Sequence, residues 1–97
     1  MTIHYVKSWP QFYQPILNGT RTSDIRSKKD RTFKIGDKLV LEEYDPFKGS
    51  YTGRKQMVEV THIISNETPC ALSSVVLDND YAVLSIKLAP FTVEETV

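Results

Sequence analysis

Alternating apolar and polar positions predict several β-strands along this chain. Ile3–Lys7 and Thr20–Ser27 have the composition of short strands, and Lys38–Tyr44 contains three consecutive aliphatic residues. Lys55–Ser65 and Tyr81–Leu88 alternate more clearly, so each strand should have one apolar face. These faces carry Val58, Val60 and Ile64 in the first strand, and Ala82, Leu84, Ile86 and Leu88 in the second.

Between the first two predicted strands the apolar spacing becomes helical. Ser8, followed by a proline and by Gln11, has the pattern of a helix N-cap with a capping box. Asn18-Gly19 is a typical helix stop. Because Pro15 cannot donate a backbone hydrogen bond, the segment should form either one kinked helix or a turn followed by a second helix. The apolar face consists of Phe12, Tyr13, Ile16 and Leu17.

Clusters of turn-forming residues separate the strands. Ser27–Asp30 is polar, and Gly36-Asp37 immediately precedes the strand that starts at Lys38. Asp45–Gly53 is dense in Asp, Pro, Gly and Ser, and we expect it to be an exposed hairpin loop carrying Phe47 and Tyr51.

These elements predict one small domain over residues 1–97. Five or so strands at short spacing, with one helical segment and no alternation of strands and helices, favour an α+β, mostly-β fold closed into a small barrel. Residues 66–80 fit either a short helical turn or an additional strand. Thr92–Val97 has the character of a frayed tail.

The charges are balanced overall but unevenly distributed. Residues 1–56 hold eleven of the twelve Lys and Arg residues and only six of the twelve Asp and Glu residues. This clustering indicates either one basic face suited to an anionic partner or charges scattered over a solvated surface. The single cysteine, Cys70, excludes an internal disulfide, and residues 1–9 lack a signal-peptide core or a membrane span. We therefore expect a cytoplasmic protein that does not bind membranes.

One motif connects the chain to a known family. Gly19-Thr20-Arg21-Thr22-Ser23-Asp24-Ile25-Arg26 resembles the ASCH motif Gly-x-Lys-x-x-Glu-x-Arg, with Arg21 in place of Lys and Asp24 in place of Glu. The segments around Ile3–Pro10, Arg26–Tyr44 and Tyr51–Arg54 are similar to a small phage and bacterial ASCH-like family of unassigned function. The resemblance implies a PUA-like β-barrel with an N-terminal helical segment, and RNA as the expected ligand.

In a strand, Asp24 and Arg26 point to the same face, whereas Arg21 points to the other face unless a bulge intervenes. Arg26 offers a planar set of donors for a phosphate or a base edge, and Asp24 can orient that guanidinium or accept from an exocyclic amine. The alternative is a structural ion pair that anchors the strand.

Single-stranded RNA is bound by cations that contact phosphates and by flat side chains on which bases stack. The sequence supplies both beside the motif, and we expect a basic groove between the helical segment and the strand Arg21–Arg26 to bind RNA or a nucleotide-like ligand. The predicted site consists of Lys7, Trp9, Arg21, Asp24, Arg26, Arg31, Tyr44, Tyr51 and Arg54.

Two other function classes remain open. Some small ASCH domains are amidohydrolases of acylated cytidines, but Arg21 replaces their motif Lys and Asp24 replaces a Thr, so that reaction is disfavoured. A different hydrolase of modified nucleosides would need Asp24 or Glu42 as its general base. The third hypothesis is a protein-interaction module whose basic face binds an acidic protein. No metal or cofactor is expected, because His4 and His62 lack partners at ligand spacing, and Cys70 has the character of a packed small hydrophobe.

Overall fold

The computed structural model describes residues 1–67 and 78–91, which form one β-sheet and one helix. The elements in chain order are β1 Ile3–Ser8, α1 Pro10–Leu17, β2 Ser23–Ser27, β3 Lys38–Asp45, β4 Ser50–Ser65 and β5 Tyr81–Ala89. The predicted strands are therefore present, with β4 starting earlier than expected because the hairpin turn occupies only residues 46–49. Cys70 and the tail predicted over 92–97 lie outside the described residues.

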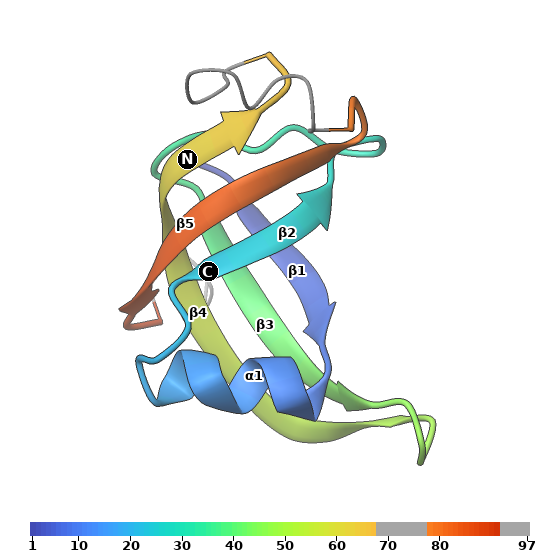
Figure 1. Cartoon of the computed structure of the whole chain (residues 1–97). Coiled ribbons are helices and arrows are strands. Elements are labelled where there is room, and N and C mark those ends of the chain that lie inside the picture. The colour runs from blue at the N-terminus through green and yellow to red at the C-terminus, as the bar shows by residue number, and fades with distance from the viewer. Residues whose placement is uncertain (68–77, 92–97) are drawn as a thin grey trace.

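The sheet is mixed and curled. Its strand order is β1-β3-β4-β5-β2, with β1 parallel to β3 and every other neighbouring pair antiparallel. The curl produces a half-barrel with α1 lying across one end, and the β3–β4 hairpin extends past the helix (Figure 1). The α+β, mostly-β class with one short helix near the N-terminus is thus confirmed.

The main core fills the inside of the curl. From the sheet it takes Val6, Leu39, Leu41, Val58, Val60, Ala82, Leu84 and Ile86, and from the helix Tyr13 and Ile16. The three aliphatic residues at the start of β3 are all buried because the sheet is covered on both faces there: Val40 packs with Met57 and Ala89 in a second cluster on the outer face. Leu88, predicted for the inner face, is exposed near the end of β5.

The prediction for the second half of β4 was wrong about its inner face. The pairing between β4 and β5 shifts between Val60 and His62, which places an extra residue, Thr61, in β4. A β-bulge of this kind reverses the alternation that follows it. Ile63 therefore packs against the core, and Ile64 does not share the face of Val60.

The predicted capping box at the start of the helix is absent. Ser8 is the last residue of β1, where it pairs with Glu43, and it is therefore not the N-cap of the helix. Trp9 is the N-cap residue, without a side-chain hydrogen bond, and its carbonyl accepts from the amides of Phe12 and Tyr13. Pro15 lies within a single eight-residue helix. None of the helices within the described residues is long and apolar enough to cross a membrane.

A buried carboxylate fixes the chain between β2 and β3. Asp37 accepts hydrogen bonds from the Thr2 and Lys34 amides at 3.0 Å each, and its Oδ2 lies 2.9 Å from Nε2 of His4. The preceding Gly36 has φ of +95°, a conformation that favours glycine, and its amide donates to the Val60 carbonyl. Burial raises the pKa of Asp37, but these hydrogen bonds outweigh it and hold the pKa below its ordinary value.

We predict that Asp37→Ala lowers the free energy of unfolding by about 3 kcal/mol, because it leaves two backbone amides and a buried imidazole without their acceptor. Chemical denaturation at pH 7 measures this. Asp30→Ala is the matched control, because Asp30 is exposed and its ion pair with Arg31 is long at 3.8 Å. This variant should change the free energy of unfolding by less than about 0.5 kcal/mol. Equal losses in the two variants would show that the Asp37 network does not stabilise the fold.

Candidate functional site

The two edge strands of the half-barrel, β1 and β2, border a cleft. No backbone pairing joins them within the described part of the chain, and side chains from both strands line two adjoining pockets. We name these the helix pocket, of about 320 Å³, and the tyrosine pocket, of about 420 Å³. Both volumes are in the range of small-molecule sites, about 300–1,000 Å³. Together the two pockets form what we call the seam cleft.

Seven of the nine predicted site residues line the seam cleft. The helix pocket is lined by Lys7, Ser8, Trp9, Phe12, Arg21, Asp24, Ile25 and Arg26. The tyrosine pocket is lined by Tyr5, Val6, Lys7, Arg26, Ser27, Asp30, Arg31, Phe33, Glu42 and Tyr51. Tyr44 and Arg54 line neither pocket.

At the centre of the helix pocket, Asp24 binds two guanidinium groups. Its Oδ2 accepts from Nε of Arg26 at 2.7 Å, and its Oδ1 accepts from Nη2 of Arg21 at 3.1 Å. Oδ1 also accepts from the amide of Ile25. Asp24 is only 5% exposed, so its carboxylate faces the two arginines rather than solvent. The two terminal amino groups of Arg26 have no hydrogen-bond acceptor among residues 1–67 and 78–91.

Arg21 joins this cluster because of how the helix ends, which the strand pattern did not predict. β2 begins only at Ser23, so Arg21 precedes the strand and is free of its alternation. The carbonyl of Pro15 accepts from the amides of Thr20 and Arg21, which ties the motif to the last turn of α1. From there Arg21 reaches Asp24, and its Nη1 donates to the Phe12 carbonyl at 3.3 Å. The expectation that Arg21 points away from Asp24 was wrong.

Two aromatic rings form the wall of the helix pocket beside these charges. Trp9 and Phe12 are each nearly half exposed, with ring centroids 6.3 Å apart and an interplanar angle of 27°. The Arg21 guanidinium lies 5.3 Å from the centre of the Phe12 ring. We expected Phe12 in the core. Helix rotation instead buries Tyr13 and Ile16 and turns Phe12 toward the cleft.

Next to the tyrosine pocket, Lys7 of β1 lies beside two tyrosines of the β3–β4 hairpin. Nζ of Lys7 is 4.3 Å from the ring centre of Tyr44 and 5.9 Å from that of Tyr51. The two rings meet edge to face at 5.0 Å across the β3–β4 hairpin. Tyr44 therefore supports Lys7 and Tyr51 from outside the tyrosine pocket.

Six residues of the tyrosine pocket were not among the predicted site residues, and two of them, Tyr5 and Glu42, matter most for its chemistry. Tyr5 is 53% exposed and shares the outer face of β1 with Lys7, as the alternation of a strand requires. That signal was available in the sequence. Glu42 reaches the pocket because β3 pairs in parallel with β1, with Glu42 opposite Lys7, and no sequence pattern reveals this pairing.

Arg54 lies away from the seam cleft and has a structural role. It binds the buried Glu43 through two hydrogen bonds of 2.9 Å, and its guanidinium is 5.0 Å from the ring centre of Tyr13. Glu43 also accepts from the hydroxyl of Thr52 at 2.6 Å. The hydrogen bonds from Arg54 outweigh burial and hold the pKa of Glu43 below its ordinary value.

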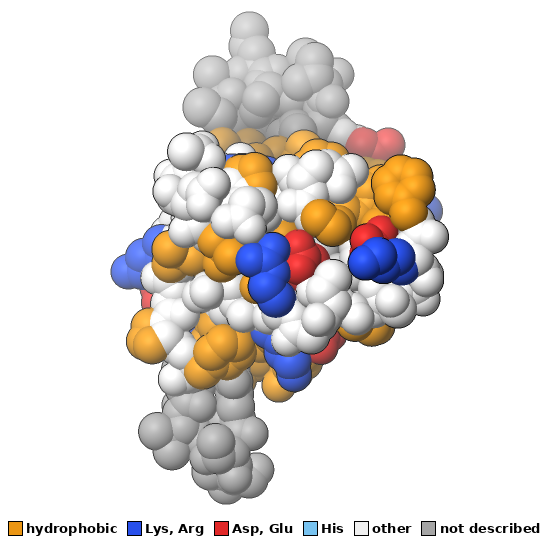
Figure 2. Space-filling model, turned by 90° about the horizontal axis from the view of Figure 1, so that it is seen from below, with side chains coloured by type: hydrophobic (Ala, Val, Ile, Leu, Met, Phe, Trp, Pro, Cys, Tyr) orange, Lys and Arg blue, Asp and Glu red, His pale blue; other side chains and the backbone are white. Residues whose placement is uncertain are grey.

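The excess of Lys and Arg in residues 1–56 does not produce a uniformly basic surface around the helix. Seen from the α1 end, Lys and Arg side chains lie apart from one another among hydrophobic and neutral groups, and some adjoin Asp or Glu (Figure 2). Elsewhere Lys38 pairs with Glu59 at 3.5 Å and Lys28 with Glu67 at 2.6 Å.

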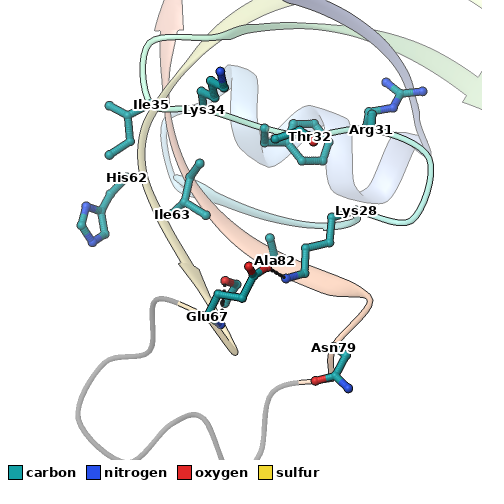
Figure 3. Close-up of a pocket in the computed structure, with 12 residues that line it drawn as sticks. Lys28, Arg31, Thr32, Lys34, Ile35, His62, Ile63, Glu67, Asn79 and Ala82 are labelled. Carbon is teal, nitrogen blue, oxygen red and sulfur yellow. Dashed lines mark hydrogen bonds and ion pairs between the residues drawn. The ribbon is translucent and has the colours of Figure 1, made fainter.

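A larger cavity of about 910 Å³ is lined by residues from the end of the half-barrel opposite α1 (Figure 3). Ile63 and Ala82 belong to its wall, and Lys28 bonds to Glu67 there. Figure 3 shows Arg31 and Lys34 pointing away from that pair, so the cations around this cavity do not converge on one point. Among the described residues, no three His, Cys, Asp or Glu side chains are grouped to hold a metal ion.

The chain is similar to proteins of unassigned function. A family model described as "Domain of unknown function (DUF3850)" matches residues 3–86, a range that includes the whole seam cleft. An uncharacterized 12.9 kDa protein in the GpA 3′ region of Escherichia phage P2 is 36% identical over 61 residues. That match covers 63% of this chain and 53% of the phage protein, so the chain spans about half the length of this relative.

We predict that Arg54→Ala destabilises the protein at pH 7 because it leaves the buried Glu43 carboxylate without its counter-ion. The pKa of Glu43 lies below its ordinary 4.5 in the folded state, so its stabilising contribution is present above that value and is lost as the pH falls through the folded pKa. The difference in unfolding free energy between wild type and variant should therefore shrink as the pH falls below about 4.5. Urea denaturation from pH 7 to pH 3 tests this, and a difference that stays constant would contradict it.

Proposed function

This chain belongs to the DUF3850 family, and we propose that it is a small binding domain that takes single-stranded RNA or a nucleotide-like ligand into the seam cleft. The observation that supports this most is the Arg21–Asp24–Arg26 cluster. A buried carboxylate holds two guanidinium groups in place, and the terminal amino groups of Arg26 keep their donors for a ligand. A guanidinium held in this way is suited to bidentate binding of a phosphate.

The surroundings of the cluster fit the same ligand. Nucleic-acid sites combine cations for the phosphates with flat rings for the bases. Lys7 is exposed and lines both pockets, as Arg26 does, and Trp9, Phe12 and Tyr51 present partly exposed rings to the cleft. Stacking on such rings contributes about 1–3 kcal/mol per base.

The proposal includes a relationship to the ASCH/PUA-like superfamily. It rests on the motif from Gly19 to Arg26, which follows a short helix and enters an edge strand of a curled, mostly-β sheet. It also includes a cytoplasmic location, for which the ground is the single cysteine.

The geometry supports binding better than a hydrolase that uses Asp24 as its base. Its carboxylate oxygens already accept from Arg21, Ile25 and Arg26. A general base needs a lone pair directed at the proton it removes. We therefore assign Asp24 a positioning role.

We predict that Arg26→Ala weakens binding of a six-nucleotide single-stranded RNA by about tenfold. It should also reduce the slope of log affinity against log salt by about 0.7, the value for one phosphate contact in a single strand. Fluorescence anisotropy from 50 to 300 mM NaCl measures both quantities. Lys7→Ala, at an exposed position where folding is not at risk, should have a similar effect on the slope.

Lys87→Ala is the matched control, because Lys87 is an exposed cation on β5 that lines neither pocket. It should leave affinity and slope nearly unchanged. The proposal fails if the wild-type protein does not bind the RNA, or if all three variants lose affinity equally. Binding to an acidic protein in the absence of RNA binding would instead favour the interaction-module reading.

A further inference from the structure

The helix pocket and the tyrosine pocket meet at two cations. Of the residues that the structure describes, Lys7 on β1 and Arg26 on β2 alone line both pockets. They come from the two edge strands and therefore approach the junction from opposite sides of the seam. The seam cleft thus has two compartments, and Lys7 and Arg26 lie where these compartments join.

From this arrangement we propose that the ligand consists of at least two linked nucleotides, with the phosphodiester between Lys7 and Arg26 and one nucleoside in each pocket. The inference rests on the proposed function and adds the size and the position of the ligand. A mononucleotide would fill only one compartment.

The tyrosine pocket has the chemistry of a nucleoside site rather than of a phosphate site. Glu42 and Asp30 place carboxylates in its wall, and Glu42 has no ion-pair partner among the described residues. Carboxylates repel phosphate but accept hydrogen bonds from ribose hydroxyls and exocyclic amines. Tyr5 and Tyr51, each about half exposed, supply flat surfaces for a base.

The helix pocket is equally suited to a nucleoside. Trp9 and Phe12 supply the rings, and Ile25 adds an exposed apolar side chain. The other cation of this pocket is turned toward the protein: Arg21 donates to Asp24 and to the Phe12 carbonyl. The cations that remain for a phosphate are therefore Arg26, through its terminal amino groups, and Lys7, the two residues that line both pockets.

The test compares the dinucleotide ApA with 5′-AMP and 3′-AMP by isothermal titration calorimetry at pH 8 in 50 mM NaCl. ApA carries one negative charge, whereas each mononucleotide carries close to two under these conditions. A site that recognises charge alone binds the mononucleotides more tightly. Occupation of both pockets predicts the reverse order, with ApA at least about tenfold tighter because a second base stacks.

Single substitutions test separately whether each pocket binds one base of ApA. Trp9→Ala and Tyr51→Ala should each weaken ApA binding about tenfold, since each removes one stacking surface. Both side chains are about half exposed, and the Trp9 carbonyl that caps α1 is retained. Phe47→Ala is the matched control: Phe47 is 96% exposed at the hairpin tip and lines neither pocket, so ApA binding should be unchanged.

The outcomes separate the two proposals. AMP binding that depends on Arg26 and is as tight as ApA binding overturns the two-nucleotide ligand and leaves nucleotide binding standing. ApA affinity that is unaffected by Trp9→Ala or by Tyr51→Ala also overturns it. Failure of ApA, both mononucleotides and the six-nucleotide RNA to bind overturns the proposed function and this inference together.

Discussion

The candidate site depends on the buried carboxylate of Asp24. A charge that is 5% exposed is stable only when it is neutralised and hydrogen-bonded, and Arg21 and Arg26 supply both conditions from the two sides of the motif. The same bonds restrict two long side chains that would otherwise be free in solution. A ligand that meets Arg26 therefore encounters a donor group whose orientation has already been set, which reduces the entropy lost on binding.

Two other buried carboxylates stabilise the half-barrel in the same way. Asp37 accepts from two backbone amides and bonds to His4 at the start of β1, and Glu43 binds Arg54 beneath the hairpin. Arg54 is held by this pair and lines neither pocket of the seam cleft. At the junction of the seam cleft, by contrast, Asp24 binds only Nε of Arg26, and Lys7 has no ion-pair partner among the described residues.

The open seam also explains why charged residues occupy the edge strands. An unpaired strand edge can pair with another chain, and charged side chains on the edge hinder that association. Lys7 on β1 and Arg26 on β2 provide this protection whatever the ligand is. The proposed binding role and the protection of the edges use the same two side chains.

The sequence by itself determined the class of fold, because hydrophobic alternation and turn chemistry are local properties. The strands, the helix and the exposed aromatics of the hairpin follow from spacing and from residues such as Gly36 and Pro46. It also indicated that Asp24 and Arg26 act together, since residues two apart in a strand share a face. Tertiary structure decided the rest. The bulge at Thr61 exchanged Ile64 for Ile63, the end of α1 brought Arg21 to Asp24, and the parallel pairing of β1 with β3 placed Glu42 beside Lys7. Each of these depends on contacts between residues far apart in the chain or on one inserted residue, and a periodic pattern contains no information about either.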